Sequence, residues 1–311
     1  MARGFVTLAT GNDKYYILAR NLLYSFKIHN PCGIPFAIIC DRENEYTEAF
    51  DDIVLMDSPS FSFLDKVRLP GLAPYDETIF IDADSLVCRN LSGLWDIVKS
   101  SPDFGIFGAI WEVDSEVGKR EFKRGGHLRA RMRFACTCQG GMYYIRKTPA
   151  LIPFQELSLY ILDHYEEFRM DGYLSPSDDN IFPLACSVLG FPPPEDWYNL
   201  FCFNPESDLK RLDIVNGVIE YRWRYCDKVL GENCYFVHFG SSYTEGWEYR
   251  REAYKVRCFI EGRQPAMSKI IGIWVSGRIK HFVRQSIICT RRIIPLRIKK
   301  ILLIMRRKHI R

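Results

Sequence analysis

Short apolar runs alternate with amphipathic helical patterns through the first half of the chain. Between the first two runs, Ile17, Leu18, Leu22 and Phe26 share one helical stripe, and Asn12 or Asp13 is a suitable N-cap. Strand, helix and strand in this order predict a right-handed crossover and a parallel sheet. The runs with the length and composition of buried parallel strands are Phe5–Ala9, Phe36–Cys40, Asp52–Met56 and Thr78–Asp82.

The pattern continues in the second half with strands and helices that are less regularly spaced. Further strands are expected at Phe104–Ile110 and Gly141–Ile145, and a helix at Leu151–Phe168. The polar stretch SPSDDN (175–180) opens another helical run, Ile181–Leu189, which the proline-rich stretch 191–197 ends. A last strand runs into a glycine-containing loop, with His238 and Gly240 at the junction. The predicted fold is α/β, with a mixed, mainly parallel central sheet.

Polar residues gather where two of the predicted strands end. Ligands of such sheets bind outside the carboxyl ends of the strands, so ATGND (9–13) and DADS (82–85) can converge on one cleft. If the strand continues through Asp82 and Asp84, their carboxylates point to one side. Two such charges about 5 Å apart repel by about 3 kcal/mol at an effective dielectric of about 20. This pair therefore indicates a bound cation or, alternatively, a turn in which each Asp accepts from a backbone N–H.

A late histidine completes a possible metal site. Mn²⁺ and Mg²⁺ favour carboxylate, imidazole and phosphate oxygen ligands, so Asp82, Asp84 and His238 would leave positions for a diphosphate. Such an ion stabilises negative charge on a departing nucleoside diphosphate. The alternative for His238 is a hydrogen-bonded residue of the core.

Composition favours a globular protein with reduced thiols. The 311 residues are 47% hydrophobic and 26% charged, which are ordinary globular values. The eleven cysteines are scattered and include no CxxC pair, and no secretory signal opens the chain. We therefore expect a cytoplasmic protein in which Cys136 and Cys138 fill apolar space rather than bind zinc.

The net charge of +4 combines two unlike parts. No acidic residue follows Glu261, whereas residues 262–311 hold 14 Lys and Arg, which leaves 28 basic against 38 acidic residues before them. We divide the chain into an acidic body, 1–265, and a basic helical tail, 266–311. One helical face of the tail carries apolar residues and the rest is largely basic, at Lys269, Arg278, Lys280 and Arg284. The apolar face consists of Ile271, Val275, Ile279, Phe282 and Val283.

This pattern suits the surface of an anionic membrane, and no run reaches the roughly 18 apolar residues that span a bilayer. We expect a peripheral protein on the inner face of the membrane. Nucleic-acid binding is the rival reading of the charge, but it does not need the apolar stripe, and we expect no nucleic acid partner. Another alternative is that the first tail helix packs on the body of the protein.

Four segments, at 5–26, 64–96, 177–182 and 237–241, resemble successive motifs of family 8 glycosyltransferases, the group of glycogenin and bacterial lipopolysaccharide galactosyl- and glucosyltransferases. The resemblance spans about residues 5 to 250. It implies a GT-A fold, a UDP-sugar donor, Mn²⁺ (or Mg²⁺), and transfer of a hexose, glucose or galactose, with retention of configuration. The acceptor would be a cell-surface glycan or lipid-linked saccharide.

The resemblance also implies roles for single residues. Asp82 and Asp84 match the metal-binding Asp-x-Asp around Ala83, and His238 matches the third ligand, followed by Gly240. Asp179 and Asn180 match a catalytic pair below the donor sugar, where Asp179 would stabilise a cationic sugar. Other donor-binding positions are Leu8, Ala9, Thr10 and Tyr15 for the uridine, Lys66 for the sugar or phosphates, and Gly140 and Gly141 beside the sugar.

Two departures from the family pattern keep other functions open. Asn180 stands where Gln is common, and the loop after His238 lacks the usual lysine, for which Arg250, Arg251 or Lys255 are the nearest substitutes. One alternative is another nucleotide-sugar transferase of the same fold, inverting or using a different nucleotide. The other is a catalytically silent glycan-binding or scaffold protein at the membrane.

Overall fold

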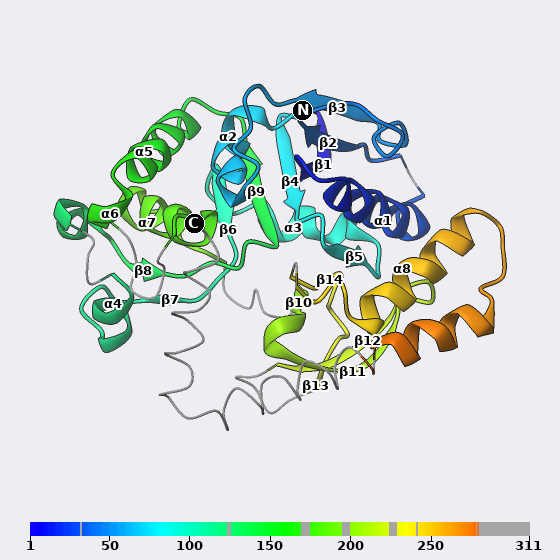
Figure 1. The fold of residues 1–311 in the computed structure, drawn as a ribbon. Helices are drawn as coiled ribbons and strands as arrows, with labels where there is room; N and C mark the ends of the chain where they lie inside the picture. The colour runs from blue at the N-terminus through cyan, green and yellow to red at the C-terminus, as the bar shows by residue number, and fades with distance from the viewer. Residues whose placement is uncertain are drawn as a thin grey trace, which may run out of the picture.

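A six-stranded sheet in the order β3-β2-β1-β4-β9-β6 forms the centre of the fold (Figure 1). The computed structural model describes residues 1–31, 33–122, 126–168, 175–194, 200–223, 229–240, 242–277 and 279. The first four strands in this order are parallel, and β9 is antiparallel to both of its neighbours. The predicted mixed, mainly parallel sheet is therefore confirmed. Its strands are β1 (Arg3–Ala9), β2 (Phe36–Cys40), β3 (Asp52–Leu55), β4 (Glu77–Ile81), β6 (Phe104–Ile106) and β9 (Met142–Arg146).

Helices cover both faces of this sheet because its central strands are apolar on both sides. In β1, Phe5 belongs to a core beneath α1 (Asp13–His29), whereas Val6 belongs to a core beneath α5 (Leu151–Asp163) and α7 (Asp178–Leu189). The side chain of Asn12 caps α1 by accepting from the N–H of Lys14, as one of the two predicted caps. The helix predicted at Leu151–Phe168 is divided at His164 into α5 and α6 (Tyr165–Phe168).

Smaller sheets complete the second half of the described chain. β5 (Ser85–Val87) pairs antiparallel with β14 (Phe236–His238), which runs parallel to β10 (Phe201–Phe203). This pairing joins the segment after β4 to the last predicted strand. The remaining elements are β7 (Ile110–Trp111), β8 (Ala135–Cys136), β11 (Ser207–Asp213), β12 (Val218–Trp223), β13 (Val229–Leu230), α2 (Leu69–Leu72), α3 (Leu94–Val98), α4 (Glu116–Glu121), α8 (Trp247–Ile260) and the 3-10 helix η1 (Phe63–Arg68).

The eight cysteines for which the structure gives a state are free and buried, which agrees with the expected small apolar fillers. Cys136 and Cys138 are both among them. Burial raises the pKa of each thiol, so neither is prepared to act as a thiolate ligand.

The first part of the tail packs on the body of the protein. Residues 267–277 are helical, and Ile273 packs with Tyr254 and Cys258 of α8. Lys269 Nζ lies 4.6 Å from the centre of the Tyr254 ring, and Arg250 donates to Ser276 Oγ at 3.0 Å. Arg278, Lys280 and the rest of the predicted tail through residue 311, apart from Ile279, lie outside the described residues. Within the described ranges, no helix is long and apolar enough to cross a membrane.

Candidate metal and nucleotide-sugar site

Three backbone connections bring the two aspartates and the histidine together. The chain leaves β4 at Ile81, and the N–H of Asp82 donates to the Gly141 carbonyl at 3.0 Å. A turn closed by the N–H of Ser85 and the carbonyl of Asp82 leads into β5, where Ser85 pairs with His238 of β14. β4 ends at Ile81, so the condition under which both carboxylates would point to one side of a continuous strand is not met. The β5–β14 pairing instead directs the two carboxylates toward the imidazole.

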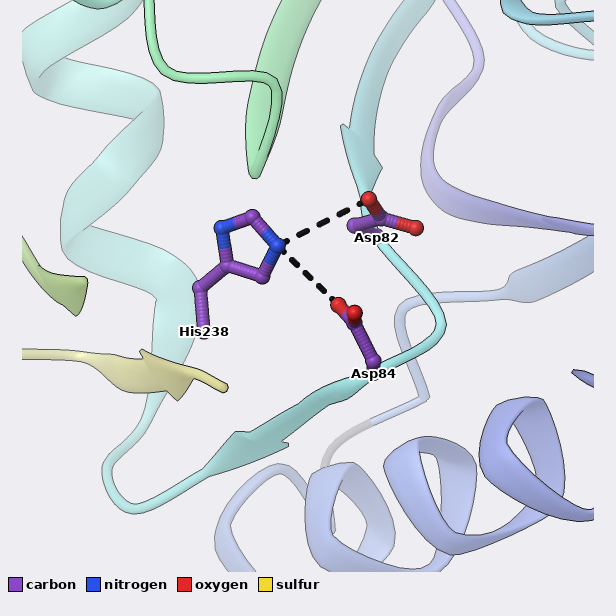
Figure 2. Close-up of side chains that lie close together, drawn as sticks. All are labelled: Asp82, Asp84 and His238. Carbon is purple, nitrogen blue, oxygen red and sulfur yellow. Dashed lines mark ion pairs between the residues drawn. The ribbon is translucent and has the colours of Figure 1, made fainter. Parts of the chain in front are cut away.

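The three side chains lie within reach of one ion. His238 Nε2 is 3.0 Å from Asp84 Oδ1 and 3.7 Å from Asp82 Oδ2 (Figure 2). One ligand atom from each residue lies within 4.8 Å of the others. Asp84 and His238 are only 7% and 6% exposed. Buried oxygen and imidazole ligands at this spacing match the preferences of Mn²⁺ and Mg²⁺.

The hydrogen bonding of the cluster supports a cation. Asp84 Oδ1 is buried, and although His238 Nε2 is close, no well-aligned hydrogen bond reaches this oxygen from the described residues. A buried acceptor without a donor is costly, and a cation would satisfy it. Asp82 behaves differently, because its Oδ1 accepts from the N–H of Ala83 at 2.8 Å. The turn alternative thus holds for one oxygen of Asp82, while the three residues together fit a divalent ion.

Charges within the cluster are strongly coupled to each other. Burial lowers the pKa of His238, but the carboxylates of Asp84 and Asp82 together outweigh burial and raise this pKa overall. Burial raises the pKa of Asp84, yet the imidazole of His238 and the charge of Lys66 together bring this pKa below its usual value. Burial dominates at Asp82 and raises its pKa despite the charge of Lys66. Without a metal, the histidine therefore acts as a partial counter-ion for the aspartates.

Lys66 supplies a second positive charge beside the cluster. Its ammonium donates to Asp82 Oδ2 at 2.6 Å and lies 3.4 Å from Asp178 Oδ2. From the sequence alone, Lys66 could also have been a solvated lysine at the end of a helix, but the structure rules this out because the residue is only 7% exposed. Burial opposes the charge of Lys66, but the surrounding carboxylates outweigh it and raise the pKa, so the ammonium stays charged.

Asp178 and Asp179, at the start of α7, face the same region. Asp178 Oδ2 accepts from the Tyr143 hydroxyl at 2.7 Å. Burial, followed by the charge of Asp178, raises the pKa of Asp179 to about 7. A Cβ at Gly140 would lie 2.7 Å from Asp179 Oδ1 and 2.8 Å from Asp178 Oδ2, so only glycine fits there. The family resemblance had pointed to Asp179, and the alternative was that Asp178 and Asp179 are N-caps of the next helix, whereas the N-cap of α7 is Ser177.

Asn180 has the contacts of a helix cap rather than of a substrate-facing group. Its Oδ1 accepts from the N–H of Ser177 at 3.2 Å, and its Nδ2 donates to the Tyr165 hydroxyl at 2.7 Å. Ser177 and Asn180 thus form the capping box of α7, and Asn180 is 3% exposed. Both polar atoms of the Asn180 side chain are thus engaged within the protein, and the catalytic role expected for Asn180 stays a prediction.

A cleft of about 270 Å³ opens beside the cluster. Its lining includes residues predicted from the sequence. They are Leu8, Ala9, Thr10 and Tyr15 from β1, α1 and the turn between them, Lys66 from η1, and Asp82, Ala83 and Asp84 after β4. Leu18, Phe61, Ser62 and Phe63 complete the lining. The sequence analysis missed Phe61 and Phe63, because Phe61 lies in a loop and Phe63 begins the short 3-10 helix η1, so neither belongs to a periodic apolar pattern.

Gly141 packs against His238, and a Cβ there would lie 2.5 Å from the imidazole Nδ1. Gly240 follows β14 with a φ of +72°, and its hypothetical Cβ meets Pro205. The expected substitutes for the missing lysine have other partners. Arg251 donates to Glu252 and Leu212, and Lys255 lies 2.7 Å from Asp213, while Arg250 binds Ser276.

Comparison with known proteins identifies the fold. The sequence matches no family model and no curated protein. Among solved structures, the bifunctional glycosyltransferase WbbM aligns with 85% of this chain at 12% identity and a TM-score of 0.51. This chain spans about half of WbbM (52%). The galactosyltransferase LgtC aligns with 83% of this chain, which covers 94% of LgtC, at 12% identity and a TM-score of 0.49.

Mouse xyloside xylosyltransferase 1 aligns with 78% of this chain, which covers 98% of it, at 13% identity and a TM-score of 0.46. The fold is thus that of GT-A-type glycosyltransferases, as predicted. Membership of family 8 stays a prediction.

Proposed function

We propose that this protein is a metal-dependent glycosyltransferase that uses a nucleotide sugar. The observation that carries the proposal is the Asp82, Asp84 and His238 cluster at the end of β4, bordering a cleft in a glycosyltransferase fold. A divalent cation bound there would supply Lewis-acid stabilisation of the departing diphosphate. The resemblance to family 8 motifs favours UDP-glucose or UDP-galactose as donor and Mn²⁺ as the ion.

Residues of the chain itself would perform the remaining tasks. Lys66 keeps its charge next to Asp82 and would orient diphosphate or sugar oxygens. Asp178 and Asp179, beside Gly140, would face the sugar and stabilise positive charge developing on it. The family resemblance favours retention of configuration, with the leaving phosphate assisting deprotonation of the acceptor hydroxyl. A cell-surface glycan or lipid-linked saccharide is the proposed acceptor.

The test is hydrolysis of a panel of nucleotide sugars with and without Mn²⁺, followed by NMR of the anomeric configuration of the product. Asp84→Asn should lose most Mn²⁺-dependent turnover and remain folded, because repulsion at the site falls. Asp208→Asn, on the exposed part of β11, is the matched control. Turnover that persists in EDTA, or in Asp84→Asn, contradicts the metal role. Donor binding without any turnover would favour the silent glycan-binding alternative.

We also propose that the helix at 267–277 attaches the protein to the cytoplasmic face of an anionic membrane. Ile273 faces α8, while an apolar stripe on the rest of the helix is 41–66% exposed. The stripe consists of Met267, Ile271, Trp274 and Val275 of this helix, together with Ile279 just beyond it. Such a stripe, on a segment with 14 basic and no acidic residues after Glu261, fits insertion at an anionic lipid surface.

Co-sedimentation with anionic and neutral vesicles tests this attachment. Ile271→Gln with Val275→Gln should reduce binding to anionic vesicles several-fold, because both side chains are exposed on the stripe. Val229→Gln, at an exposed apolar position of β13, should bind like the wild type. Equal binding by all variants would contradict the role of the stripe.

A further inference from the structure

Two exposed phenylalanines line the cleft without a role in the chemistry described above. Phe61 is 61% exposed and Phe63 is 59% exposed, and both border the cleft together with Tyr15, which is 42% exposed. Large aromatic side chains exposed together at a concave site indicate a binding surface for an apolar, planar group. The metal cluster does not need them.

The backbone at Phe61 is held in an unfavourable conformation. Its φ is +55°, in the left-handed region that bulky residues rarely adopt. Strain of this kind persists only where neighbouring groups enforce it, and it is concentrated at functional sites. The ring of Phe61 lies against Gly11, where a Cβ would come 2.9 Å from the ring. The loop thus places an aromatic ring beside the turn between β1 and α1.

Asp65 is the group that enforces this loop conformation. It is 1% exposed and accepts from the N–H of Ser60 at 2.6 Å, the N–H of Phe61 at 3.1 Å and the hydroxyl of Thr10 at 2.8 Å. The hydroxyl of Ser60 is a further donor at 2.8 Å. One buried carboxylate therefore ties the loop that carries Phe61 to the predicted nucleotide-binding segment after β1.

The cleft has a charged part and an aromatic part. Its charged part is the Lys66–Asp82 pair, and the ring of Phe63 is centred 5.9 Å from the Lys66 ammonium. Phe61 then extends the aromatic surface to Gly11. A nucleoside diphosphate has the same arrangement, with a charged diphosphate at one end and a planar base at the other.

We propose that Phe61 and Phe63 bind the nucleobase of the donor by stacking, and that Asp65 holds the loop that carries Phe61. This inference rests on the proposed function, because it assumes a nucleotide donor. Aromatic stacking accepts any base, so the pair would provide affinity, while the choice among bases would depend on other contacts.

Calorimetric titration of the full-length protein in Mn²⁺ tests the proposal. The probes are UDP, ADP and GDP, and inorganic pyrophosphate as a ligand without a base. Phe61→Ala and Phe63→Ala should each weaken the best nucleotide by about ten- to a hundredfold. Pyrophosphate affinity should stay within about twofold of wild type. Phe259→Ala, at an exposed phenylalanine of α8, is the matched control, and Phe63→Tyr should restore nucleotide affinity.

The outcomes separate this inference from the proposed function. Wild-type binding of a nucleotide that neither phenylalanine variant weakens overturns the stacking role and leaves the proposed function standing. Equal weakening of nucleotide and pyrophosphate also overturns it, because a base-specific contact cannot affect pyrophosphate. Absence of nucleotide binding by the wild type overturns both. Melting curves of each variant show whether a loss of affinity follows from loss of fold.

Discussion

Replacing Lys66 by methionine should destabilise the metal-free protein and make its stability depend on added cation. The ammonium of Lys66 lies 2.6 Å from Asp82 Oδ2 and 3.4 Å from Asp178 Oδ2, and the residue is 7% exposed. Removing one partner of a buried ion pair leaves an uncompensated charge and costs about 3–5 kcal/mol. Methionine keeps most of the side-chain volume, so this electrostatic cost should dominate the change in unfolding free energy.

Mn²⁺ should recover most of that loss. A cation at the cluster would restore positive charge next to Asp82, and in the variant it would not compete with Lys66 for Asp82 Oδ2. In the wild type, an ion present at a concentration of about 100 times its Kd would raise the free energy of unfolding by about 2.7 kcal/mol. We expect a larger gain in Lys66→Met, because its Kd for Mn²⁺ should be lower by about tenfold.

Urea unfolding at several Mn²⁺ concentrations measures both effects. Lys255→Met is the matched control, because Lys255 is a part-buried lysine 2.7 Å from Asp213 and 3.5 Å from Glu252, outside the cleft. It should lose stability but respond to Mn²⁺ like the wild type. The reasoning is refuted if Lys66→Met loses less than about 1 kcal/mol, or if Mn²⁺ stabilises it no more than the wild type.

Three further changes test the geometry of the site. Gly141→Ala should weaken Mn²⁺ binding about tenfold by displacing the His238 ring, whereas Gly272→Ala, in open space, should not, as calorimetry can show. Asn180→Ala should lower the free energy of unfolding by about 1–2 kcal/mol through loss of the capping box. A large loss of turnover in a variant that remains folded would instead support a catalytic role for Asn180. The pKa of Asp179 is raised to about 7 in the folded state, whereas in the unfolded chain this carboxyl loses its proton near pH 4. The free energy of unfolding of the wild type should therefore fall as the pH rises from about 4 to 7. Asp179→Asn should lack this dependence on pH. Between about pH 4 and 7 its free energy of unfolding should rise by about 2 kcal/mol relative to that of the wild type, which is half the full value because Asp179 is partly exposed. The same pH dependence in the variant and the wild type would contradict this reasoning.

The central sheet was predictable because its signal is local. Phe36–Cys40 was predicted with the bounds that the structure has, since a strand buried on both faces is apolar at every position. The cap of α1 at Asn12 follows from the same local chemistry. The split of the helix at His164 was missed, because residues on both sides of the break keep an apolar pattern.

The site was predictable only as far as motifs identify residues. Asp82, Asp84, His238 and Lys66 do lie together, but the reason is the antiparallel pairing of β5 with β14, segments about 150 residues apart. No local sequence pattern predicts a pairing between strands so far apart in the chain. The contributions of Asp65 and Phe61 depend on contacts to Thr10 and Gly11, so they become visible only once the loop is folded against β1.

The balance of charge at the candidate site would couple the binding of a metal ion to the binding of a nucleotide. Asp82, Asp84, Asp178 and Asp179 surround a single lysine, and His238 adds a positive charge only when protonated. A diphosphate approaching this group of carboxyls would meet more negative than positive charge, at distances where burial weakens screening by salt. His238 must also release its proton to bind an ion, because a metal ligand needs the neutral imidazole. For the proposed function, these charges favour an order in which the cation would enter before, or together with, the nucleotide.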